Sequence, residues 1–272
     1  MMARFGALAV ALVLGAGLFV VGAEATSFKQ DFLPIGSVRT DPLLFDSIGE
    51  CLSDHVHTFY GAASNYTLRP SSSWDDLRAA KGNSGNVEEN KSLYWHPSIY
   101  KVVNSSNETT LFELAPIWFA SAYYVWPTGE ARAFPDGFKM RTSDSDELAR
   151  ATAYCAPEPG PCERPDGCEP LPNQDFLPAS ACWELEMNIK FPTCWDGVNL
   201  SAADESHVAW SLGCSDLTSS GSFDPECAEF PCPASHPVRL PELHFYVRIL
   251  DYQGGAHVFS DNTDTFHADY QR

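Results

Sequence analysis

Alternating polar and apolar residues give the clearest structural pattern in the chain. Over residues 184–191 (ELEMNIKF), every second side chain is apolar. Because neighbouring side chains of an extended chain point to opposite faces, this pattern predicts a half-buried β-strand. Three further segments rich in aromatic and β-branched residues predict strands, namely 116–126, 243–250 and 257–260. Pro135-Asp136-Gly137 predicts a turn between two strands.

Helical periodicity is scarce in the chain. Residues 74–80 and 144–152 predict short helices, each with Asp or Ser near its start as an N-cap. We therefore expect a mainly β, disulfide-bonded and loop-rich single domain that resembles a β-sandwich and contains few short helices.

Residues 155–178 (CAPEPGPCERPDGCEPLPNQDFLP) interrupt the strand pattern. This segment is rich in Pro, Gly, Cys and acidic residues, so it cannot form a regular helix or a central strand. Several cysteines lie in or beside it: Cys155, Cys162, Cys168 and Cys182. The composition predicts a disulfide-tied surface loop inserted in the domain.

The N-terminal segment has the order of a secretory signal peptide. A single positive charge at Arg4 precedes an uncharged apolar stretch, which ends at Ala23-Glu24-Ala25. We expect a signal peptide over residues 1–25 and a secreted, extracellular domain over residues 26–272, with no stable membrane span after cleavage. The alternative is that residues 1–25 stay attached as a membrane anchor.

Secretion would place the nine cysteines in an oxidising compartment, where most would pair as disulfides and at least one would stay unpaired. The sequence contains no Cys-x-x-Cys pair, which argues against a zinc ribbon or a thioredoxin-type centre. Asn-x-Ser/Thr sequons fit a secreted glycoprotein and predict surface positions at Asn65, Asn90, Asn104, Asn107 and Asn199.

The charge of the chain excludes one class of partner. There are 36 acidic and 17 basic residues, which give a formal net charge of -19. Such a surface repels a phosphate backbone, and no run of basic residues offsets it, so we expect no nucleic-acid partner.

The strongest chemical signal is the pair His55 and His57. In an extended segment, residues two apart point to the same face, so both imidazoles could bind one divalent transition metal. A metal site needs further ligands from distant segments. Candidates from the sequence are Asp196, His207, His236 and His267. The alternative is a histidine pair that is hydrogen-bonded in a polar cleft without a metal.

Aromatic and cationic side chains suggest substrate contacts. Trp95 and Trp210 belong to a set of aromatic residues that could stack on sugar rings or, alternatively, fill the core. Arg239 is a candidate anchor for a substrate carboxylate, with an ion pair to a neighbouring carboxylate as the alternative, and His236 lies close to it in sequence. Hydrolase and nucleotide motifs such as Gly-x-Ser-x-Gly and His-Glu-x-x-His are absent from the sequence.

Several segments of the chain form an ordered set. They are RTDP (39–42), HVHTFYG (55–61), NKSLYWHPSIY (90–100), AFPDGFKM (133–140), FPTCWDGVNL (191–200), SHVAW (206–210) and CPASHPVRLPEL (232–243). In this order they resemble a secreted, fungal-type family, the domain of unknown function numbered nineteen ninety-six. FHADYQR (266–272) resembles the closing His-Gly-Asp segment of this family, with Ala268 at the glycine position.

The resemblance implies a class of chemistry and not a specific activity. Some members of the family are joined to modules that bind cell-wall carbohydrate, which favours glycan or cell-wall chemistry. All the candidate histidines named above, and Asp196, fall inside the resembling segments. Cys194 and Cys232 do so as well, and the resemblance implies a disulfide between them.

Three functions stay open from the sequence. The first is a metal-dependent enzyme acting on extracellular or cell-wall polysaccharide, in which His55 and His57 bind the metal together with His207 or His267, and Asp196 is a ligand or a catalytic base. The second is a non-catalytic glycan-binding or cell-wall protein. The third is an extracellular cation-binding protein that uses its acidic surface.

Overall fold

The architecture is taken from a computed structural model of the chain. It describes residues 26–43, 53–63, 74–105, 109–127, 131–143, 151–156, 175–213 and 230–272. The predicted signal peptide, most of the predicted loop insertion and five of the nine cysteines lie outside the described residues.

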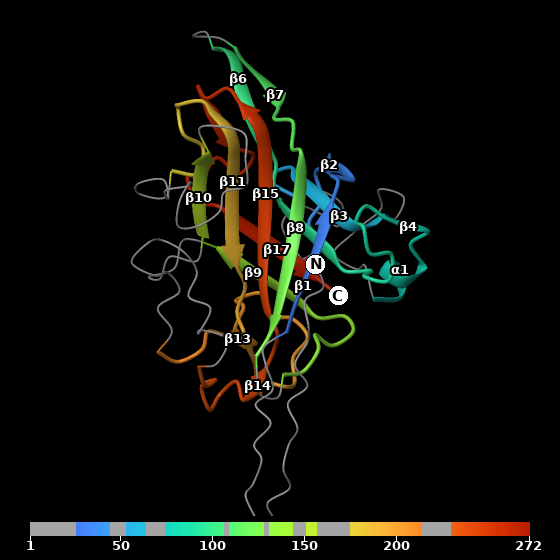
Figure 1. Cartoon of the computed structure of the whole chain (residues 1–272). Helices are drawn as coiled ribbons and strands as arrows, with labels where there is room; N and C mark the ends of the chain where they lie inside the picture. The colour runs from blue at the N-terminus through green and yellow to red at the C-terminus, as the bar shows by residue number, and fades with distance from the viewer. Residues whose placement is uncertain are drawn as a thin grey trace, which may run out of the picture.

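A five-stranded antiparallel sheet forms one layer (Figure 1). Its strands, in spatial order, are β1 (Thr26–Phe32), β8 (Phe119–Trp126), β15 (Glu242–Tyr252), β11 (Cys182–Lys190) and β10 (Ala151–Ala156). The alternation over residues 184–191 is confirmed as strand β11, because Leu185, Met187 and Ile189 are fully buried in the core.

A six-stranded antiparallel sheet forms the second layer, and its strands β17 and β9 pass behind β15 and β11 in Figure 1. The order is β2 (Gly36–Val38), β3 (His57–Ala63), β5 (Leu93–Pro97), β17 (His267–Gln271) and β9 (Lys139–Ser143), with β4 (Gly82–Asn83) paired to β3. Rings from both sheets meet between them: Phe245 stacks on Tyr94 with 5.5 Å between ring centroids. The expected sandwich-like, mainly β fold is confirmed.

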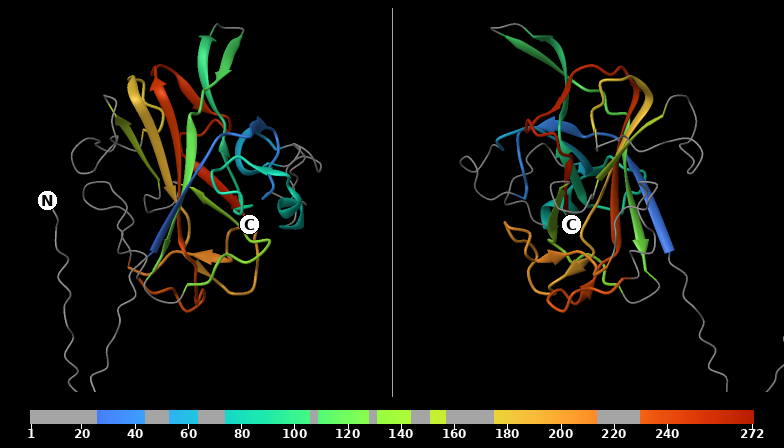
Figure 2. Two further views of the ribbon diagram at one scale, coloured as in Figure 1. Left: turned by 45° about the vertical axis from the view of Figure 1, so that its right-hand side comes forward. Right: turned by 90° about the vertical axis from the view of Figure 1, so that its left-hand side faces the viewer.

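Two small sheets extend this sandwich at opposite ends, as Figures 1 and 2 show. One consists of β16 (His257–Phe259), β6 (Ile99–Ser105) and β7 (Thr110–Leu114), and its β6–β7 hairpin projects from the body. The other, called here the small sheet, consists of β13 (Val208–Ala209), β12 (Cys194–Trp195) and β14 (Val238–Arg239). The helix α1 (Trp74–Ala79) packs Leu77 into a second, smaller core with Phe59 and Trp95.

Most of the predicted elements agree with the structure. The strands expected over 116–126, 243–250 and 257–260 correspond to β8, β15 and β16, and the helix expected over 74–80 is α1. Gly137 closes the predicted turn with a φ of 83°, and the amide of Phe138 donates to the carbonyl of Pro135.

The prediction of a helix over residues 144–152 is wrong for its last two residues. Residues 144–150 lie outside the described residues, and Ala151 and Thr152 begin strand β10. They pair with Ile189 and Asn188 of β11, so sheet pairing overrides the local helical pattern.

Disulfides stabilise the five-stranded sheet and the small sheet. Cys155–Cys182 joins β10 to β11 and closes the 155–178 segment, as expected for a disulfide-tied loop. Cys194–Cys232 ties β12 to the segment before β14, which confirms the pairing implied by the family resemblance. In the described part of the chain, no helix is long and apolar enough to cross a membrane.

Candidate metal centre

Two strands of the six-stranded sheet bring distant histidines to the same edge. Strand β3 begins at His57 and strand β17 begins at His267, and both strands pair with β5. His57 lies opposite Pro97, and Asp269 lies opposite Trp95, so continuing the ladder places His267 level with Pro97 as well. The two histidines therefore stand on either side of one residue of the central strand.

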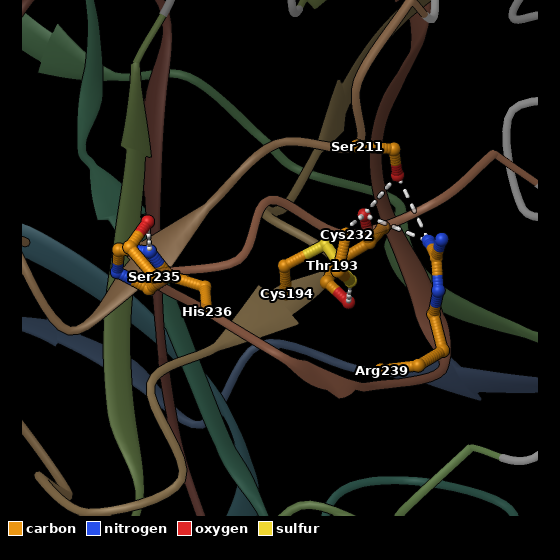
Figure 3. The surroundings of a disulfide bond; sticks show 7 residues. All are labelled: Thr193, Cys194, Ser211, Cys232, Ser235, His236 and Arg239. Atoms are coloured by element: carbon orange, nitrogen blue, oxygen red, sulfur yellow. Dashed lines mark hydrogen bonds between the residues drawn. A yellow bond between two sulfur atoms is a disulfide. The ribbon is translucent and has the colours of Figure 1, made fainter.

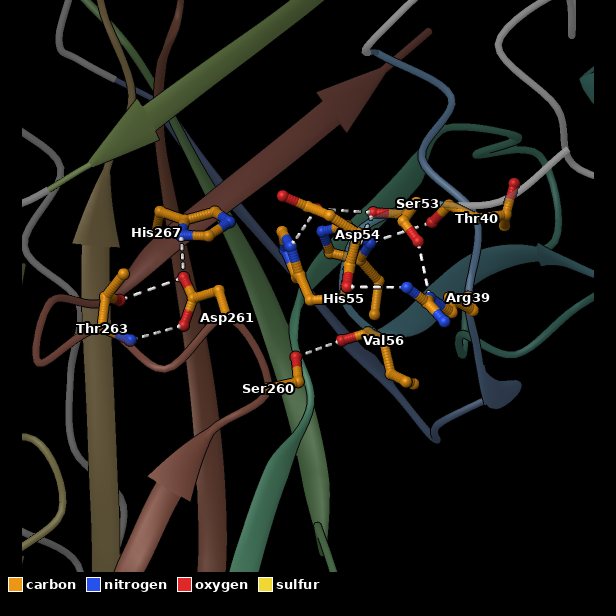
Figure 4. A network of polar contacts seen from close by, with 11 residues as sticks. Arg39, Thr40, Ser53, Asp54, His55, Val56, Ser260, Asp261, Thr263 and His267 are labelled. Atoms are coloured by element: carbon orange, nitrogen blue, oxygen red, sulfur yellow. Dashed lines mark hydrogen bonds and ion pairs between the residues drawn. The ribbon is translucent and has the colours of Figure 1, made fainter. Parts of the chain in front are cut away.

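Strand alternation sets the face on which these histidines lie. In β17, Ala268 and Tyr270 are buried in the core between the sheets, so His267 and Asp269 point to the other face. In β3, Tyr60 enters the same core and His57 lies on the opposite face. His55 precedes β3 by two residues and joins them there (Figure 4).

His55, His57 and His267, called here the histidine cluster, could hold one metal ion. Each offers one ring nitrogen, and these three nitrogens all lie within 4.8 Å of one another. The ring centroids of His55 and His57 are 4.2 Å apart. A tetrahedral zinc with bonds of roughly 2.1 Å separates its ligand nitrogens by about 3.4 Å, so small side-chain rotations would complete the site.

Each ring of the cluster has its Nδ1 held by an oxygen. His57 Nδ1 donates to the carbonyl oxygen of Thr40 at 2.9 Å. His55 Nδ1 lies 2.6 Å from Asp54 Oδ1, and His267 Nδ1 lies 3.3 Å from Asp261 Oδ2. Oxygen partners on Nδ1 orient the ring and leave Nε2 for a metal, which is the usual arrangement around protein-bound zinc.

The opposite nitrogens of two rings are buried without a hydrogen bond. Neither His55 Nε2 nor His57 Nε2 has a partner in the described part of the chain. A carbonyl oxygen only accepts, so the proton of His57 resides on Nδ1 and its Nε2 carries a lone pair. A buried polar atom without a partner is costly, and a metal ion would relieve that cost.

The acidic partners of the cluster are themselves fixed. Asp261 accepts from the amide of Thr263 at 3.1 Å, and Arg39 donates to the carbonyl oxygens of Ser53 and Asp54 (Figure 4). Burial raises the pKa values of Asp54 and Asp261, but hydrogen bonds from their histidines, the charge of those histidines and further hydrogen bonds together lower both pKa values below the ordinary range. Both carboxylates therefore stay ionised at neutral pH.

His57 is neutral over the whole physiological range. Burial, together with the neighbouring His55 and His267, lowers the pKa of His57 to about 3. Neutral imidazole is the form that binds a metal, so this ring is ready to act as a ligand without losing a proton.

A row of carboxyl groups lies next to the cluster on the same face. Asp269 follows His267 by two residues and is almost completely buried, and neither of its carboxyl oxygens has a hydrogen-bond partner in the described part of the chain. Burial raises the pKa of Asp269 well above its ordinary value, and Asp41 adds to this shift. Glu205 accepts from the amide of Arg141 at 2.9 Å, and burial raises its pKa to about 7.

The segment that contains Asp41 lies across this face. The carbonyl of Thr40 accepts from His57, and the carbonyl of Pro42 accepts from Lys139 Nζ at 2.9 Å. Asp41, between them, is buried and interacts electrostatically with Asp269. Neither Asp41 nor Asp269 was among the candidates from the sequence, although the spacing of Asp269 from His267 repeats the spacing of His55 and His57.

The structure places His207 away from the cluster. Its Nε2 donates to the carbonyl of Lys139 at 2.7 Å, and Lys139 begins β9, whereas Ser143 at the other end of β9 pairs with His267. Four residues of strand separate these levels by about 13 Å. His207 therefore does not join the other predicted ligands in this arrangement.

Asp196 shapes a turn rather than facing the cluster. It accepts from the amides of Val198 and Asn199 at 2.8 and 2.9 Å, and Gly197 within the turn has a φ of 82°. Burial raises the pKa of Asp196, but these hydrogen bonds, together with one from the Asn199 side chain and the nearby His207, lower it below the ordinary value. Its carboxylate is occupied by its own backbone, which does not agree with a catalytic role beside His55.

His236 and Arg239 lie near the Cys194–Cys232 disulfide (Figure 3). His236 Nδ1 hydrogen-bonds with Ser235 Oγ, and its Nε2 donates to the carbonyl of Ser206. Arg239 donates to Ser211 Oγ at 2.8 Å. These two residues are together, as their sequence positions indicate, but they are on the small sheet and not at the cluster.

The two tryptophans predicted to bind substrate have different environments. Trp210 is half-buried directly after β13. Trp95 is fully buried and stacks on Phe59 with 5.7 Å between ring centroids. The predicted stacking of Trp95 on a sugar is therefore wrong, because both faces of this ring are enclosed in the core.

Comparison with known proteins gives one result. The family described as Domain of unknown function (DUF1996) matches residues 41–272. No curated protein and no solved structure matches the chain significantly.

Proposed function

The chain belongs to this family of unknown function, and we propose that it is a secreted, metal-dependent enzyme acting on extracellular or cell-wall polysaccharide. The observation that carries the proposal is the convergence of three imidazoles whose Nδ1 atoms are held by oxygens. Three nitrogen donors suit zinc or another divalent transition metal and do not suit calcium or magnesium, which prefer oxygen.

Three protein ligands leave a fourth position for water or substrate, which is the pattern of catalytic rather than structural zinc sites. A metal in this position would lower the pKa of its bound water to about 7 or polarise a substrate oxygen. The residues of the chain supply orientation: Asp54, Asp261 and the Thr40 carbonyl fix the rings. Asp269, whose pKa is raised by burial, lies on the same face and would lose its proton more readily beside a bound cation.

The secreted location and the polysaccharide substrate rest on other grounds. The N-terminal segment has the order of a signal peptide, and the disulfides among the described residues fit an oxidising compartment. The resemblance to a family with carbohydrate-binding modules supports glycan chemistry.

Metal content and activity on one preparation test the proposal. We expect about one zinc or other transition-metal ion per chain in the untagged secreted protein, and its release by a chelator should abolish hydrolysis of cell-wall polysaccharide. His267→Ala should lose both metal and activity. His236→Ala is the matched control and should keep both, because this half-buried histidine is bonded to Ser206 on another part of the molecule.

Less than about a tenth of a metal ion per chain, after dialysis against trace metals at neutral pH, would contradict the metal site. A full metal complement without activity on any polysaccharide would leave the site intact and point to another candidate function, an extracellular protein that binds the metal at the histidine cluster without catalysis. The narrow access to the cluster favours that candidate, since the side chains of His55 and His267 are only 10% and 15% exposed.

A further inference from the structure

The described sequons differ sharply in what their asparagine side chains do. Asn90 is half-buried, and its Nδ2 donates to Gln30 Oε1 at 2.6 Å and to Tyr94 Oη at 3.1 Å. Its Oδ1 accepts from the amide of Ser92 at 3.0 Å. Gln30 and Tyr94 are fully buried, so both hydrogens of this amide point into the protein.

An N-linked glycan cannot coexist with this arrangement at Asn90. The glycosidic bond replaces one of the two hydrogens on Nδ2, which would leave Gln30 or Tyr94 without its donor. The first sugar would also have to occupy the side of the amide that faces these two buried residues. Folded molecules should therefore be unmodified at this sequon.

Asn104 has the opposite environment. It lies near the end of β6, in the hairpin that projects from the body in Figures 1 and 2, and it is exposed. Its side chain makes no hydrogen bond within the described residues. A β-bulge between Val102 and Asn104 alters the register of the hairpin there, and Asn104 pairs with Leu111 on β7.

The hairpin also exposes an unusual number of apolar side chains. Val103, Leu111, Phe112 and Leu114 are each 46–54% exposed, on a two-stranded element that has little core of its own. Leu111 and Phe112 are consecutive in β7 and point to opposite faces, so the exposed apolar side chains are divided between the two faces of the hairpin. The side chain of Asn104 starts next to Leu111, so a bulky and solubilising glycan attached there would lie over the face that carries Leu111.

We propose that Asn104 is an N-glycosylation site whose glycan covers the face of the β6–β7 hairpin that carries Leu111, and that Asn90 is a sequon left unmodified in the folded protein. The inference rests on the secretory route of the proposed function and is independent of the metal site. Asn199 lies outside the comparison, since its Nδ2 makes a single bond to the exposed Asp196 and one hydrogen would remain after glycosylation.

Glycosylation-site mapping tests the proposal directly. The full chain, secreted from a eukaryotic host behind that host's own leader, is deglycosylated enzymatically in heavy-oxygen water, and the labelled asparagines are identified by peptide mass spectrometry. We expect label at Asn104 and none at Asn90. Label at Asn90 in folded protein, or absence of label at Asn104, would overturn the assignment.

A matched variant tests the covering role. Ser106→Ala removes the Asn104 sequon, leaves Asn104 in place and leaves the Asn107 sequon intact, so we expect the loss of one glycan and stronger binding of a hydrophobic dye. Loss of the glycan with unchanged dye binding would contradict the covering role. Metal content measured on the same samples should not change, so a failure of this proposal is distinguishable from a failure of the metal site.

Discussion

The histidine cluster and the small sheet contain the same kinds of residues, and they use them in opposite ways. In the cluster, oxygens hold the Nδ1 atoms and the Nε2 atoms of His55 and His57 have no protein partner. Near the small sheet, the Nε2 atoms of His207 and His236 are themselves bonded to the carbonyls of Lys139 and Ser206.

The carboxylates of the two regions also differ in the groups that donate hydrogen bonds to them. Asp54 and Asp261 accept from imidazoles and thereby orient possible metal ligands. Asp196 accepts from the amides of its own turn. Which ring nitrogen is occupied, and by what, therefore separates a candidate metal site from a structural hydrogen-bond network more reliably than the presence of His and Asp.

Removing one histidine from each region gives the largest expected contrast. His57→Ala should weaken zinc binding by more than about 100-fold. Substituting a residue that only orients a ligand typically costs about 10–100-fold in metal affinity, and removing the ligand itself should cost more. His207→Ala should leave zinc affinity unchanged, since His207 bonds to the carbonyl of Lys139. Competition against a chromophoric zinc chelator measures both values. Equal losses in the two variants would mean that the two regions form one site.

Opening the disulfide of the small sheet should produce the next largest effect. The double variant Cys194→Ser/Cys232→Ser releases a loop with a sequence separation of 38, and loop entropy predicts a stability loss of about 4 kcal/mol. Urea unfolding monitored by tryptophan fluorescence gives this value. Zinc affinity of the folded fraction should not change. A parallel fall in zinc affinity would instead show that the small sheet supports the cluster.

The contrast between the two regions also explains which features of the site could be predicted from the sequence. Period-two alternation predicted β11 because the apolar side chains of that strand enter the core and its polar side chains lie on the other face. The predicted half-burial is wrong, since Glu186, Asn188 and Lys190 on that other face are buried too. The same periodicity predicted that His55 and His57 share a face. The third ligand required the sheet order, since His267 reaches His57 only because β3 and β17 both pair with β5.

Other features of the site could not be predicted from the sequence. Trp95 and Trp210 are both aromatic, and only three-dimensional packing encloses Trp95 between Phe59 and the rest of the second core. Asp261 orients His267 from a loop whose position depends on β16. Asp54 was adjacent to His55 in sequence, but its role became visible only when its carboxylate was found on Nδ1.

Removing one charged partner from each region should have a smaller effect. Asp261→Asn keeps the size of the side chain but removes its charge, so zinc affinity should fall by about 10–100-fold. Asp196→Asn is the matched control and should leave zinc affinity unchanged, because this carboxylate accepts from Val198 and Asn199. Isothermal titration with zinc compares the two. Unchanged affinity in Asp261→Asn would remove this carboxylate from the metal site.

His96 and His236 provide the smallest contrast, between a histidine fully buried in the core and a half-buried one near the small sheet. His96 Nδ1 donates to the carbonyl of Pro97, and its Nε2 accepts from the hydroxyl of Tyr60, so only the neutral ring fits. Burial lowers the pKa of His96 from 6.5 to about 4. The unfolded chain therefore binds a proton below pH 6.5 that the folded chain does not.

Acidification should accordingly destabilise the folded protein, and His96 alone should account for about 2 kcal/mol between pH 7 and pH 5. His96→Gln removes this proton uptake and should make the stability less dependent on pH by that amount, whatever its effect at pH 7. His236→Gln, the same substitution near the small sheet, is measured alongside as the control. Urea unfolding in the presence of a chelator, which keeps metal out of the neighbouring cluster, measures the slopes. Parallel slopes for His96→Gln and the wild type would show that His96 titrates normally, and that its hydrogen bonds to Tyr60 and Pro97 do not hold it neutral.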